Sequence, residues 1–319
     1  MKSITKSTLA NKIIFHDAVK PEPQAGEVRI RVIFSPIHHQ DLFRIDLPPV
    51  SYMDAGTTLG SEAVGIVDAL GPGVTTFRVG ERVAGEGNFW SEYVTANEKE
   101  IFKIPSEIDD ITAAQISSIP LTALTLIEFG NLKPGDTVLL NAASSTLART
   151  FAKISREKNI NTIKLARYTS AKRALLKEGF NCVIDTSDQN WESQVRSISS
   201  NIKMAIDNIS GTEGGKLTEL LEEGGLLACV GALSGSYISL PILSVIFNEI
   251  QIKGFHRSKF LAKLSENFRH IAMEEIINLA CKGKIKFQTS DILHYSNVED
   301  ALRKARALPR EKVLLDFRD

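Results

Sequence analysis

A row of hydroxyl side chains follows an apolar segment near the middle of the chain. Residues 137–142 form a continuous apolar stretch, typical of a buried strand, and run into Ala143-Ser144-Ser145-Thr146-Leu147-Ala148-Arg149 and a predicted helix. The start of a helix presents backbone N–H groups that bind phosphate. Ser144, Ser145 and Thr146 could add hydroxyl donors, and Leu147 belongs to the same turn. The loop is therefore a candidate phosphate-binding site for a dinucleotide.

A basic residue ends the next predicted strand. Residues 162–165 are followed by Ala166, Arg167 and Tyr168, with no acidic residue nearby. In dinucleotide-binding sheets an acid at this place binds the ribose 2′-hydroxyl of NAD, whereas an arginine accommodates the 2′-phosphate of NADP. Arg167 suits a 2′-phosphate, and Tyr168 could stack on adenine. The alternative is a solvent-exposed arginine after a strand, but the position favours NADPH as cofactor.

Alternating strands and helices must position these residues. Apolar strands are predicted at 137–142, 162–165, 182–185, 204–207, 226–230 and 250–255, and helices at 170–177, 191–198 and 212–222. Buried apolar strands that alternate with amphipathic helices predict a parallel, doubly wound sheet. Ligands of such sheets bind at the carboxyl ends of the strands, beside the switch point of the strand order.

The first third of the chain has a different pattern. From residue 26 to about 104, short alternating runs are separated by turn residues, as in 28–32 and in 63–70 with its closing Gly71-Pro72-Gly73. This pattern predicts a β-rich, barrel-like domain. A helix at 265–282 and a last strand at 312–316 are expected to return the chain to it. We expect residues 1–121, completed by 259–319, to form one domain and 122–258 the other.

Length and composition agree with two folded domains. The chain has 319 residues, 38 basic and 38 acidic, so its formal net charge is zero. It therefore offers no electrostatic footprint for nucleic acid or for an anionic membrane surface. No apolar run reaches the ~18 residues of a membrane span. The mildly basic residues 1–6 are expected to belong to the folded domain rather than to a transit peptide.

The three cysteines are Cys182, Cys229 and Cys281. They are odd in number, far apart and without a Cys-x-x-Cys pair, which excludes a disulfide framework and a structural zinc site. A reduced, cytoplasmic compartment fits best.

The sharpest motif is Gly60-Ser61-Glu62-Ala63-Val64-Gly65-Ile66-Val67, which continues through Gly71, Val74 and Gly80-Glu81-Arg82-Val83. An ordinary hairpin does not require glycine, glutamate and valine at all these offsets. The stretch resembles the medium-chain dehydrogenase/reductase superfamily, and the resemblance extends from 21–23 to 311–314. Three further segments are most similar to its zinc-free branch of quinone oxidoreductases and enoyl-thioester reductases: Ser35-Pro36-Ile37 with Asp41, Pro120-Leu121-Thr122-Ala123, and Asn141-Ala142-Ala143-Ser144-Ser145.

The resemblance implies an α/β protein with a GroES-like β-barrel domain and a Rossmann domain. In the zinc-dependent branch a Cys, a His and a second Cys bind the catalytic ion. The matching positions here look like His38, Ser61 and 120–122, and one possible ligand cannot complete a zinc site. His38 and His39 could form half of a metal site, but we expect partly exposed polar side chains lining the cleft.

The resemblance also implies further coenzyme contacts. Thr122 matches a residue near the nicotinamide, and segments that line the nicotinamide and phosphate match Val230-Gly231-Ala232 and Phe255-His256-Arg257. The alternative for each is packing at a strand end. Related enzymes carry glycine at the positions of Thr146 and Ala148, so coenzyme binding could be weakened here.

Enoyl-thioester reductases of this type carry a tyrosine at a position that looks like Pro49, and Tyr52 could swing into the same space or be an ordinary loop aromatic. We expect a zinc-independent, NADPH-dependent reductase of quinones or α,β-unsaturated carbonyls, which takes a small-molecule substrate. The alternatives are a 2-enoyl-thioester reductase acting through Tyr52, and a non-catalytic NADPH-binding or interaction protein. The resemblance also implies a homodimer formed through the nucleotide domain.

Overall fold

The computed structural model describes residues 1–7, 12–46, 57–235, 237–265, 267–307 and 312–318. Two compact units make up the chain: unit 1 is Met1–Leu121 with Ile271–Asp319, and unit 2 is Thr122–His270. The return to unit 1 therefore falls at Ile271 and not at residue 259. The intervening residues stay with unit 2, where Phe260 packs edge-on against Phe129 and tilts against Phe255.

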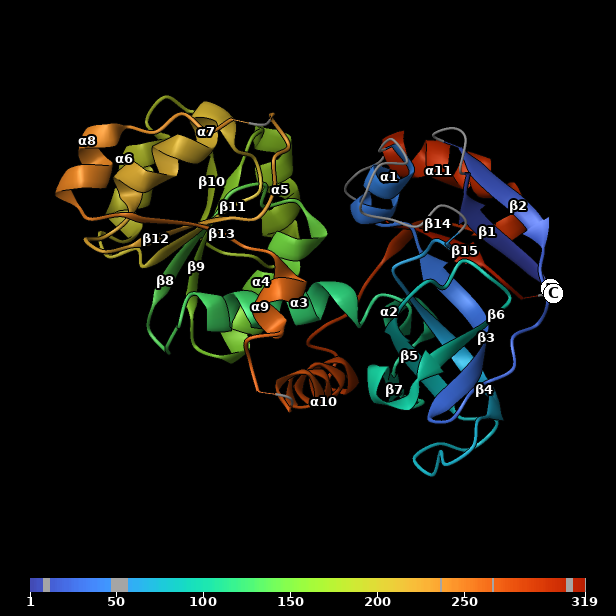
Figure 1. The fold of residues 1–319 in the computed structure, drawn as a ribbon. Coiled ribbons are helices and arrows are strands. Elements are labelled where there is room, and N and C mark those ends of the chain that lie inside the picture. Colours follow the sequence, from blue (N-terminus) through green and yellow to red (C-terminus); the bar gives the residue numbers. More distant parts are fainter. Residues whose placement is uncertain (8–11, 47–56, 236, 266, 308–311, 319) are drawn as a thin grey trace. The chain divides into compact units, whose positions relative to one another are not determined.

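Unit 1 is a mixed β-sheet with few helices (Figure 1). Its strands are β1 (Lys2–Lys6), β2 (Ile13–Asp17), β3 (Glu27–Pro36), β4 (Glu62–Leu70), β5 (Arg82–Glu86), β6 (Tyr93–Asn97), β7 (Ile101–Lys103), β14 (Thr289–His294) and β15 (Lys312–Asp316). Its helices are α1 (His39–Asp46), α2 (Asp110–Ala113) and α11 (Val298–Ala307). The strand order is β14-β15-β3-β4-β5-β7, with β6 also paired to β3, and β1 and β2 form a separate hairpin.

Alternation along β3 builds the core of unit 1. Val28, Ile30 and Val32 are buried in one cluster, as expected for a strand with one face turned inward. The C-terminal strand β15 pairs antiparallel with β3, which confirms that the last strand returns to the first domain. In the glycine motif, Gly60 has φ +93°, and a Cβ there would lie 2.2 Å from Trp90 Cδ1. This close approach explains why glycine is required.

Unit 2 contains one parallel six-stranded sheet. Its strands are β8 (Thr137–Leu140), β9 (Asn161–Ala166), β10 (Val183–Asp185), β11 (Met204–Asp207), β12 (Leu226–Cys229) and β13 (Gln251–Gly254). The helices are α3 (Ser118–Phe129) and α10 (Phe268–Cys281), which cross the unit boundaries, and α4 (Thr146–Glu157), α5 (Thr169–Lys177), α6 (Trp191–Ile198), α7 (Gly211–Lys216), α8 (Ile242–Phe247) and α9 (Arg257–Leu261).

The strand order β10-β9-β8-β11-β12-β13 is the doubly wound order 3-2-1-4-5-6 of a Rossmann domain. The predicted fold class is confirmed. The order reverses between β8 and β11, so the switch point lies where these two strands end.

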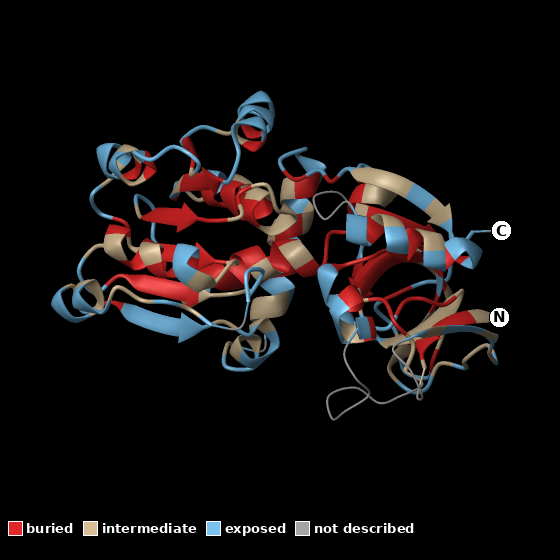
Figure 2. Cartoon of the chain, turned by 90° about the horizontal axis from the view of Figure 1, so that it is seen from above, coloured by how far each residue is buried: buried red, intermediate tan, exposed pale blue. Residues whose placement is uncertain are grey.

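Helices cover both faces of this sheet. On one face, Leu139, Ile163 and Ile184 pack with Trp191 of α6. On the other, Ala166 and Val183 pack with Ala171 and Leu175 of α5. Figure 2 shows most of the sheet as buried, in agreement with the continuous apolar strands of the sequence. Among the described residues, no helix is long and apolar enough to span a membrane.

Candidate functional site

A buried amide–carboxylate contact joins the two strands at the switch point of unit 2. Asn141 Nδ2 donates to Asp207 Oδ1 at 2.6 Å, and Asn141 Oδ1 accepts from the Asn208 N–H at 2.8 Å. Asp207 is fully buried and also accepts the N–H groups of Ile209 and Ser210. Such a satisfied polar network holds the strand ends rigidly. We did not single out Asp207 from the sequence, although an aspartate that ends an apolar strand was the available signal.

The predicted phosphate loop leads into the N-terminus of α4. Ser145 is its N-cap, and its Oγ accepts from the Ala148 N–H at 3.2 Å. The first N–H groups of a helix have no intrahelical acceptor. Those of Thr146 and Leu147 are therefore suited to bind an anion at the switch point.

Backbone strain in this loop lies at Ala142, which has φ +48°. That conformation favours glycine. Thr146 is the first residue of α4 and is absent from the positive-φ residues, whereas Ala148 is buried and packs. The positions of Thr146 and Ala148 therefore require no glycine for the backbone to fold.

Asn208 adds a donor at the same edge. Its Nδ2 is buried and has no hydrogen-bond partner among the described residues. An unsatisfied buried donor is costly, and an acceptor on a bound coenzyme would satisfy it. The strand order, the α4 N-terminus and this amide together fit a dinucleotide.

Arg167 and Tyr168 lie beyond the end of β9, and both are exposed. The Arg167 guanidinium lies 5.5 Å from the centroid of the Tyr168 ring. Arg167 thus combines an exposed charge with an aromatic neighbour, which suits the 2′-phosphate and adenine functions predicted for the pair.

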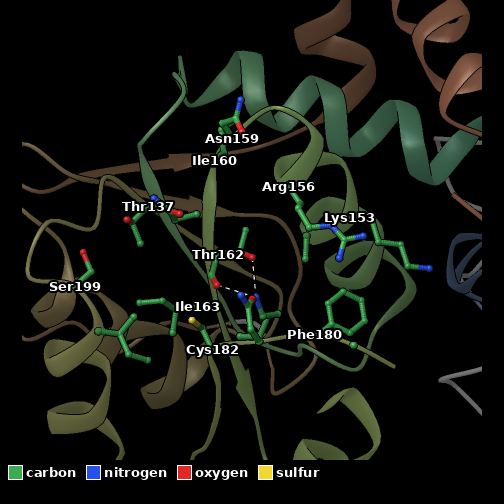
Figure 3. A pocket seen from close by; sticks show the side chains of 16 residues that line it. Thr137, Lys153, Arg156, Asn159, Ile160, Thr162, Ile163, Phe180, Cys182 and Ser199 are labelled. Atoms are coloured by element: carbon green, nitrogen blue, oxygen red, sulfur yellow. Dashed lines mark hydrogen bonds between the residues drawn. The ribbon is translucent and has the colours of Figure 1, made fainter. Parts of the chain in front are cut away.

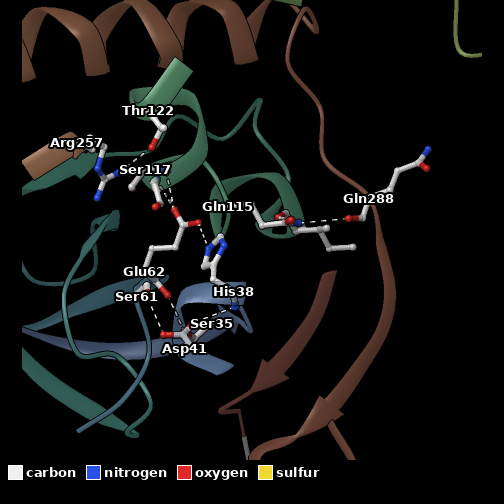
Figure 4. A network of polar contacts seen from close by, with 12 residues as sticks. Ser35, His38, Asp41, Ser61, Glu62, Gln115, Ser117, Thr122, Arg257 and Gln288 are labelled. Carbon is white, nitrogen blue, oxygen red and sulfur yellow. Dashed lines mark hydrogen bonds and ion pairs between the residues drawn. The ribbon is translucent and has the colours of Figure 1, made fainter. Parts of the chain in front are cut away.

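The residues predicted to line the nicotinamide and phosphate include a bonded pair, Thr122 and Arg257, and two residues with packing or capping contacts, Phe255 and His256. Arg257 Nη1 donates to Thr122 Oγ1 at 3.4 Å, so the structure brings these two together (Figure 4). Phe255 packs edge-on against Phe129 at 5.1 Å, and His256 caps α9 by accepting the Lys259 N–H. Phe255 and His256 therefore make structural contacts.

The end of β12 shows a packing reason for its glycine. A Cβ at Gly231 would lie 2.8 Å from the Asn208 carbonyl oxygen. The Gly231 carbonyl accepts from Ser210 Oγ at 3.0 Å. Val230 beside it is half-buried and Ala232 is exposed, so these residues border the carboxyl edge of the sheet.

Unit 1 contains a second buried polar network, centred on Glu62 (Figure 4). Glu62 Oε1 lies 2.6 Å from His38 Nε2, and Oε2 accepts the N–H groups of Ser117 and Ser118 at 2.9 and 2.8 Å. Ser35 Oγ donates to the Glu62 carbonyl at 2.6 Å. Glu62 is fully buried, and each carboxylate oxygen has a partner.

Asp41 extends this network. It accepts the His38 N–H at 2.8 Å and Ser61 Oγ at 2.6 Å. Burial raises the pKa of Asp41, which His38 and Ser61 partly oppose. Burial also lowers the pKa of Lys312, and the nearby Asp41 and Glu62 oppose that shift.

The prediction that His38 is partly exposed is wrong. Its side chain is only 6% exposed, because Glu62 pairs with it in the interior, whereas His39 is exposed as predicted. Among the described residues, no cluster of three or more His, Cys, Asp or Glu side chains could hold a metal ion. Pro49 and Tyr52 lie outside the described residues, so the predicted proton donor stays a prediction.

Comparisons with known proteins agree with this architecture. Residues 24–106 match the model of the alcohol dehydrogenase GroES-like domain. The chain is 29% identical to a mitochondrial enoyl-[acyl-carrier-protein] reductase of Arabidopsis thaliana over 300 residues, which cover 89% of this chain and 78% of that protein. It is 26% identical over 312 residues to a synaptic vesicle membrane protein VAT-1 homolog of Danio rerio, which covers 89% of this chain and 63% of the relative.

Among solved structures, a Bacillus thuringiensis protein assigned as an NADPH:quinone reductase superimposes with a TM-score of 0.87 at 27% identity, covering 99% of this chain and 98% of that chain. The GroES-like match covers most of the strands of unit 1, and the full-length similarities add the Rossmann sheet of unit 2. With its buried Glu62 network and its switch-point loop, the chain belongs to the medium-chain dehydrogenase/reductase superfamily.

Proposed function

We propose that the chain is an NADPH-dependent, zinc-independent oxidoreductase that transfers a hydride to a quinone or an α,β-unsaturated carbonyl. The observation that carries the proposal is the switch point of unit 2, where the α4 N-terminus follows β8 and Arg167 follows β9. The names of the similar reductases support it.

Different residues of unit 2 would bind different parts of the coenzyme. The N–H groups of Thr146 and Leu147 would bind the pyrophosphate. Arg167 would pair with the 2′-phosphate, and Tyr168 offers a ring for the adenine. When bound, the reduced nicotinamide supplies the hydride, and a proton from a donor or from water completes the reduction.

Zinc independence is supported by the donor set of unit 1. The atoms that would face a metal at the matching positions, His38 Nε2 and Ser61 Oγ, contact Glu62 and Asp41 instead. A catalytic zinc needs three protein ligands.

The second candidate is a 2-enoyl-thioester reductase, which the enoyl-[acyl-carrier-protein] reductase relative favours. It needs a proton donor for the reduced carbon, and Tyr52 is our candidate for that role. Quinone reduction makes a smaller demand, because the reduced oxygens take protons from water.

Coenzyme binding tests the proposal directly. Titration of NADPH and NADH by fluorescence is expected to show at least tenfold tighter binding of NADPH. Loss of one hydrogen-bonded charge pair is worth about 1.5–3 kcal/mol, so Arg167→Ala is expected to weaken NADPH binding roughly 10- to 100-fold and leave NADH unchanged. Lys177→Ala, an exposed cation on α5, is the matched control.

The outcomes separate the function classes. Absence of NADPH binding at about 1 mM would refute both enzyme proposals. If NADPH binds, turnover of a quinone but not of an enoyl thioester supports the first candidate. Turnover of the thioester that Tyr52→Phe abolishes supports the second, and binding without turnover of either supports a non-catalytic NADPH-binding protein.

We also propose that the chain forms a homodimer through unit 2. Strand β13 is an edge strand of the sheet, and all four of its residues are exposed. Helix α8, which precedes it, exposes Ile242, Leu243, Ile246 and Phe247. An open edge beside exposed apolar side chains is suited to pairing with a second copy. Light scattering tests the dimer. The unsubstituted chain is expected to be dimeric and the Phe247→Lys variant monomeric.

A further inference from the structure

A pocket of about 560 Å³ lies in unit 2 (Figure 3), and no residue of the candidate coenzyme loop lines it. Thr137 and Thr162, near the starts of β8 and β9, line it, and so does Cys182, which directly precedes β10. Because these strands are parallel, the pocket is at the amino edge of the sheet, whereas the phosphate loop is at the carboxyl edge. The volume is that of a small-molecule site.

Three basic side chains line this pocket: Lys153 and Arg156 of α4, and Lys164 of β9. The remaining lining residues include no aspartate or glutamate. Lys164 is only 2% exposed, although a buried charge is expensive unless it is paired. Glu157, which is outside the lining, lies 3.9 Å from Arg156, but no acid of the lining balances the two lysines.

The bonding of the two lysines points to a missing anion. Lys164 Nζ donates to the Thr162 carbonyl and to Thr162 Oγ1, both at 2.8 Å, and an ammonium has three donors. Lys153 has neither a hydrogen bond nor an ion pair to any residue that the structure describes. Both lysines thus keep donors for a ligand.

Arg156 acts electrostatically on both lysines of the pocket. Burial, with Arg156 adding to it, lowers the pKa of Lys164 to about 8, and Cys182 opposes the shift. Burial also lowers the pKa of Lys153; Glu178 opposes this, and Arg149 and Arg156 add to it. Glu178 is itself paired with Arg149 at 2.6 Å. A bound anion would relieve the repulsion between Arg156 and each lysine.

We propose that this pocket is a second ligand site, independent of the coenzyme loop, that binds a small molecule carrying two or more phosphate groups. Phosphate matches the guanidinium fork of Arg156 and the point charges of the lysines. Because the pair of Arg156 with Glu157 is long, at 3.9 Å, a bisphosphate or diphosphate matches the positive charge of the lining better than a single phosphate does. The polar side chains of Asn159, Asn161 and Ser199 and the ring of Phe180 on the same walls leave room for an organic part.

Cys182 provides a readout that does not depend on enzymatic activity. It lines the pocket and is exposed, so a ligand is expected to slow its alkylation by iodoacetamide. Cys281 on α10 is also exposed but does not line the pocket, and it serves as the internal control. The probes are pyrophosphate, a hexose bisphosphate and uridine diphosphate, each compared with potassium chloride at equal ionic strength, and labelled peptides are quantified by mass spectrometry.

The expected result is at least fivefold slower labelling of Cys182 with no change at Cys281. The double variant Lys153→Gln, Arg156→Gln changes a half-buried and an exposed side chain of α4 and is expected to need at least tenfold more probe. Lys177→Gln is expected to behave as the unsubstituted protein. Equal protection by the three probes supports recognition of the phosphate groups alone. Stronger protection by the hexose bisphosphate or by uridine diphosphate supports recognition of a sugar phosphate or of a nucleotide, respectively.

Three results would overturn the proposal: no protection at about 5 mM probe, equal protection of Cys281, or protection that the double variant leaves unchanged. Thermal unfolding of the variants, measured in parallel, establishes that each is folded. Because the readout requires neither NADPH nor turnover, failure of this proposal and failure of the proposed function are distinguishable.

Discussion

Replacement of Glu62 by alanine tests the buried network of unit 1 most directly. The Glu62 side chain accepts the N–H groups of Ser117 and Ser118 and contacts His38 Nε2. All four residues are buried, so water cannot replace the lost acceptor. An unsatisfied buried donor costs about 1–3 kcal/mol. With two amides and one imidazole affected, we expect Glu62→Ala to lower the free energy of unfolding of unit 1 by about 4 kcal/mol, or roughly 10 °C in Tm.

Glu62→Gln is the matched control. Its carbonyl oxygen can still accept the two amides, and its amide nitrogen can donate to a neutral His38 ring. The expected loss is therefore about 1 kcal/mol. This comparison separates the hydrogen bonds from the negative charge, because both variants remove the charge and only alanine removes the acceptor.

Urea unfolding followed by the fluorescence of Trp90 measures the effect. Trp90 is fully buried in unit 1 and Trp191 lies in unit 2, so a Trp191→Phe background isolates the signal. Hydrogen exchange at the Ser117 and Ser118 amides is expected to accelerate in the alanine variant. If Glu62→Ala were within about 1 kcal/mol of Glu62→Gln, the network would not hold this part of the unit together, and the reasoning would be refuted.

Three further predictions concern backbone conformation and a buried charge. Gly60→Ala places a Cβ 2.2 Å from Trp90 Cδ1 at φ +93°, so we expect a loss of roughly 3 kcal/mol or more in unfolding experiments; a near-neutral result would contradict this geometry. Glycine adopts the φ of +48° found at Ala142 without the clash of a Cβ, so Ala142→Gly is expected to stabilise unit 2 by about 1 kcal/mol in calorimetry, whereas a decrease would show that Ala142 is unstrained. Burial lowers the pKa of Lys164 to about 8 from 10.5, so the unfolded chain binds more protons between these values. In phosphate-free buffer, the stability of the unsubstituted protein relative to Lys164→Met should rise by about 1 kcal/mol per pH unit from pH 8 to 10, and parallel pH curves would contradict the shift.

Much of the fold could be predicted from the sequence, because local pattern determines it. The predicted helix 191–198 and strands 204–207 and 312–316 coincide with α6, β11 and β15 residue for residue. The helix 191–198 has amphipathic spacing, and the two strands are short apolar runs, each ending in aspartate. The alternation of strands and helices also led to the parallel sheet, since short crossovers of one hand leave few other topologies.

The burial of His38 could not be predicted in the same way. Locally the sequence reads His-His-Gln-Asp, which is typical of an exposed turn, and the pairing partner Glu62 is 24 positions away. Only the antiparallel pairing of β3 and β4 brings the two segments together. The polar pocket at the amino edge of the sheet was missed for a related reason, since Lys164 interrupts an apolar strand and a single charge carries no periodic signal.

The hydrogen bonds of His38 and Ser61 in unit 1 affect which of the proposed substrates needs fewer catalytic groups from this chain. His38 Nε2 and Ser61 Oγ, at the positions that resemble metal ligands, are bonded to Glu62 and Asp41. Turning either toward a cation would remove a donor from a buried carboxylate, at about 1–3 kcal/mol per group. In the proposed reaction, the developing oxyanion would then be stabilised by hydrogen-bond donors or by solvent. A quinone would take protons from water at both oxygens and would need no proton donor from the chain. An enoyl thioester would need a donor at carbon, and Tyr52, the candidate for that role, lies outside the described residues.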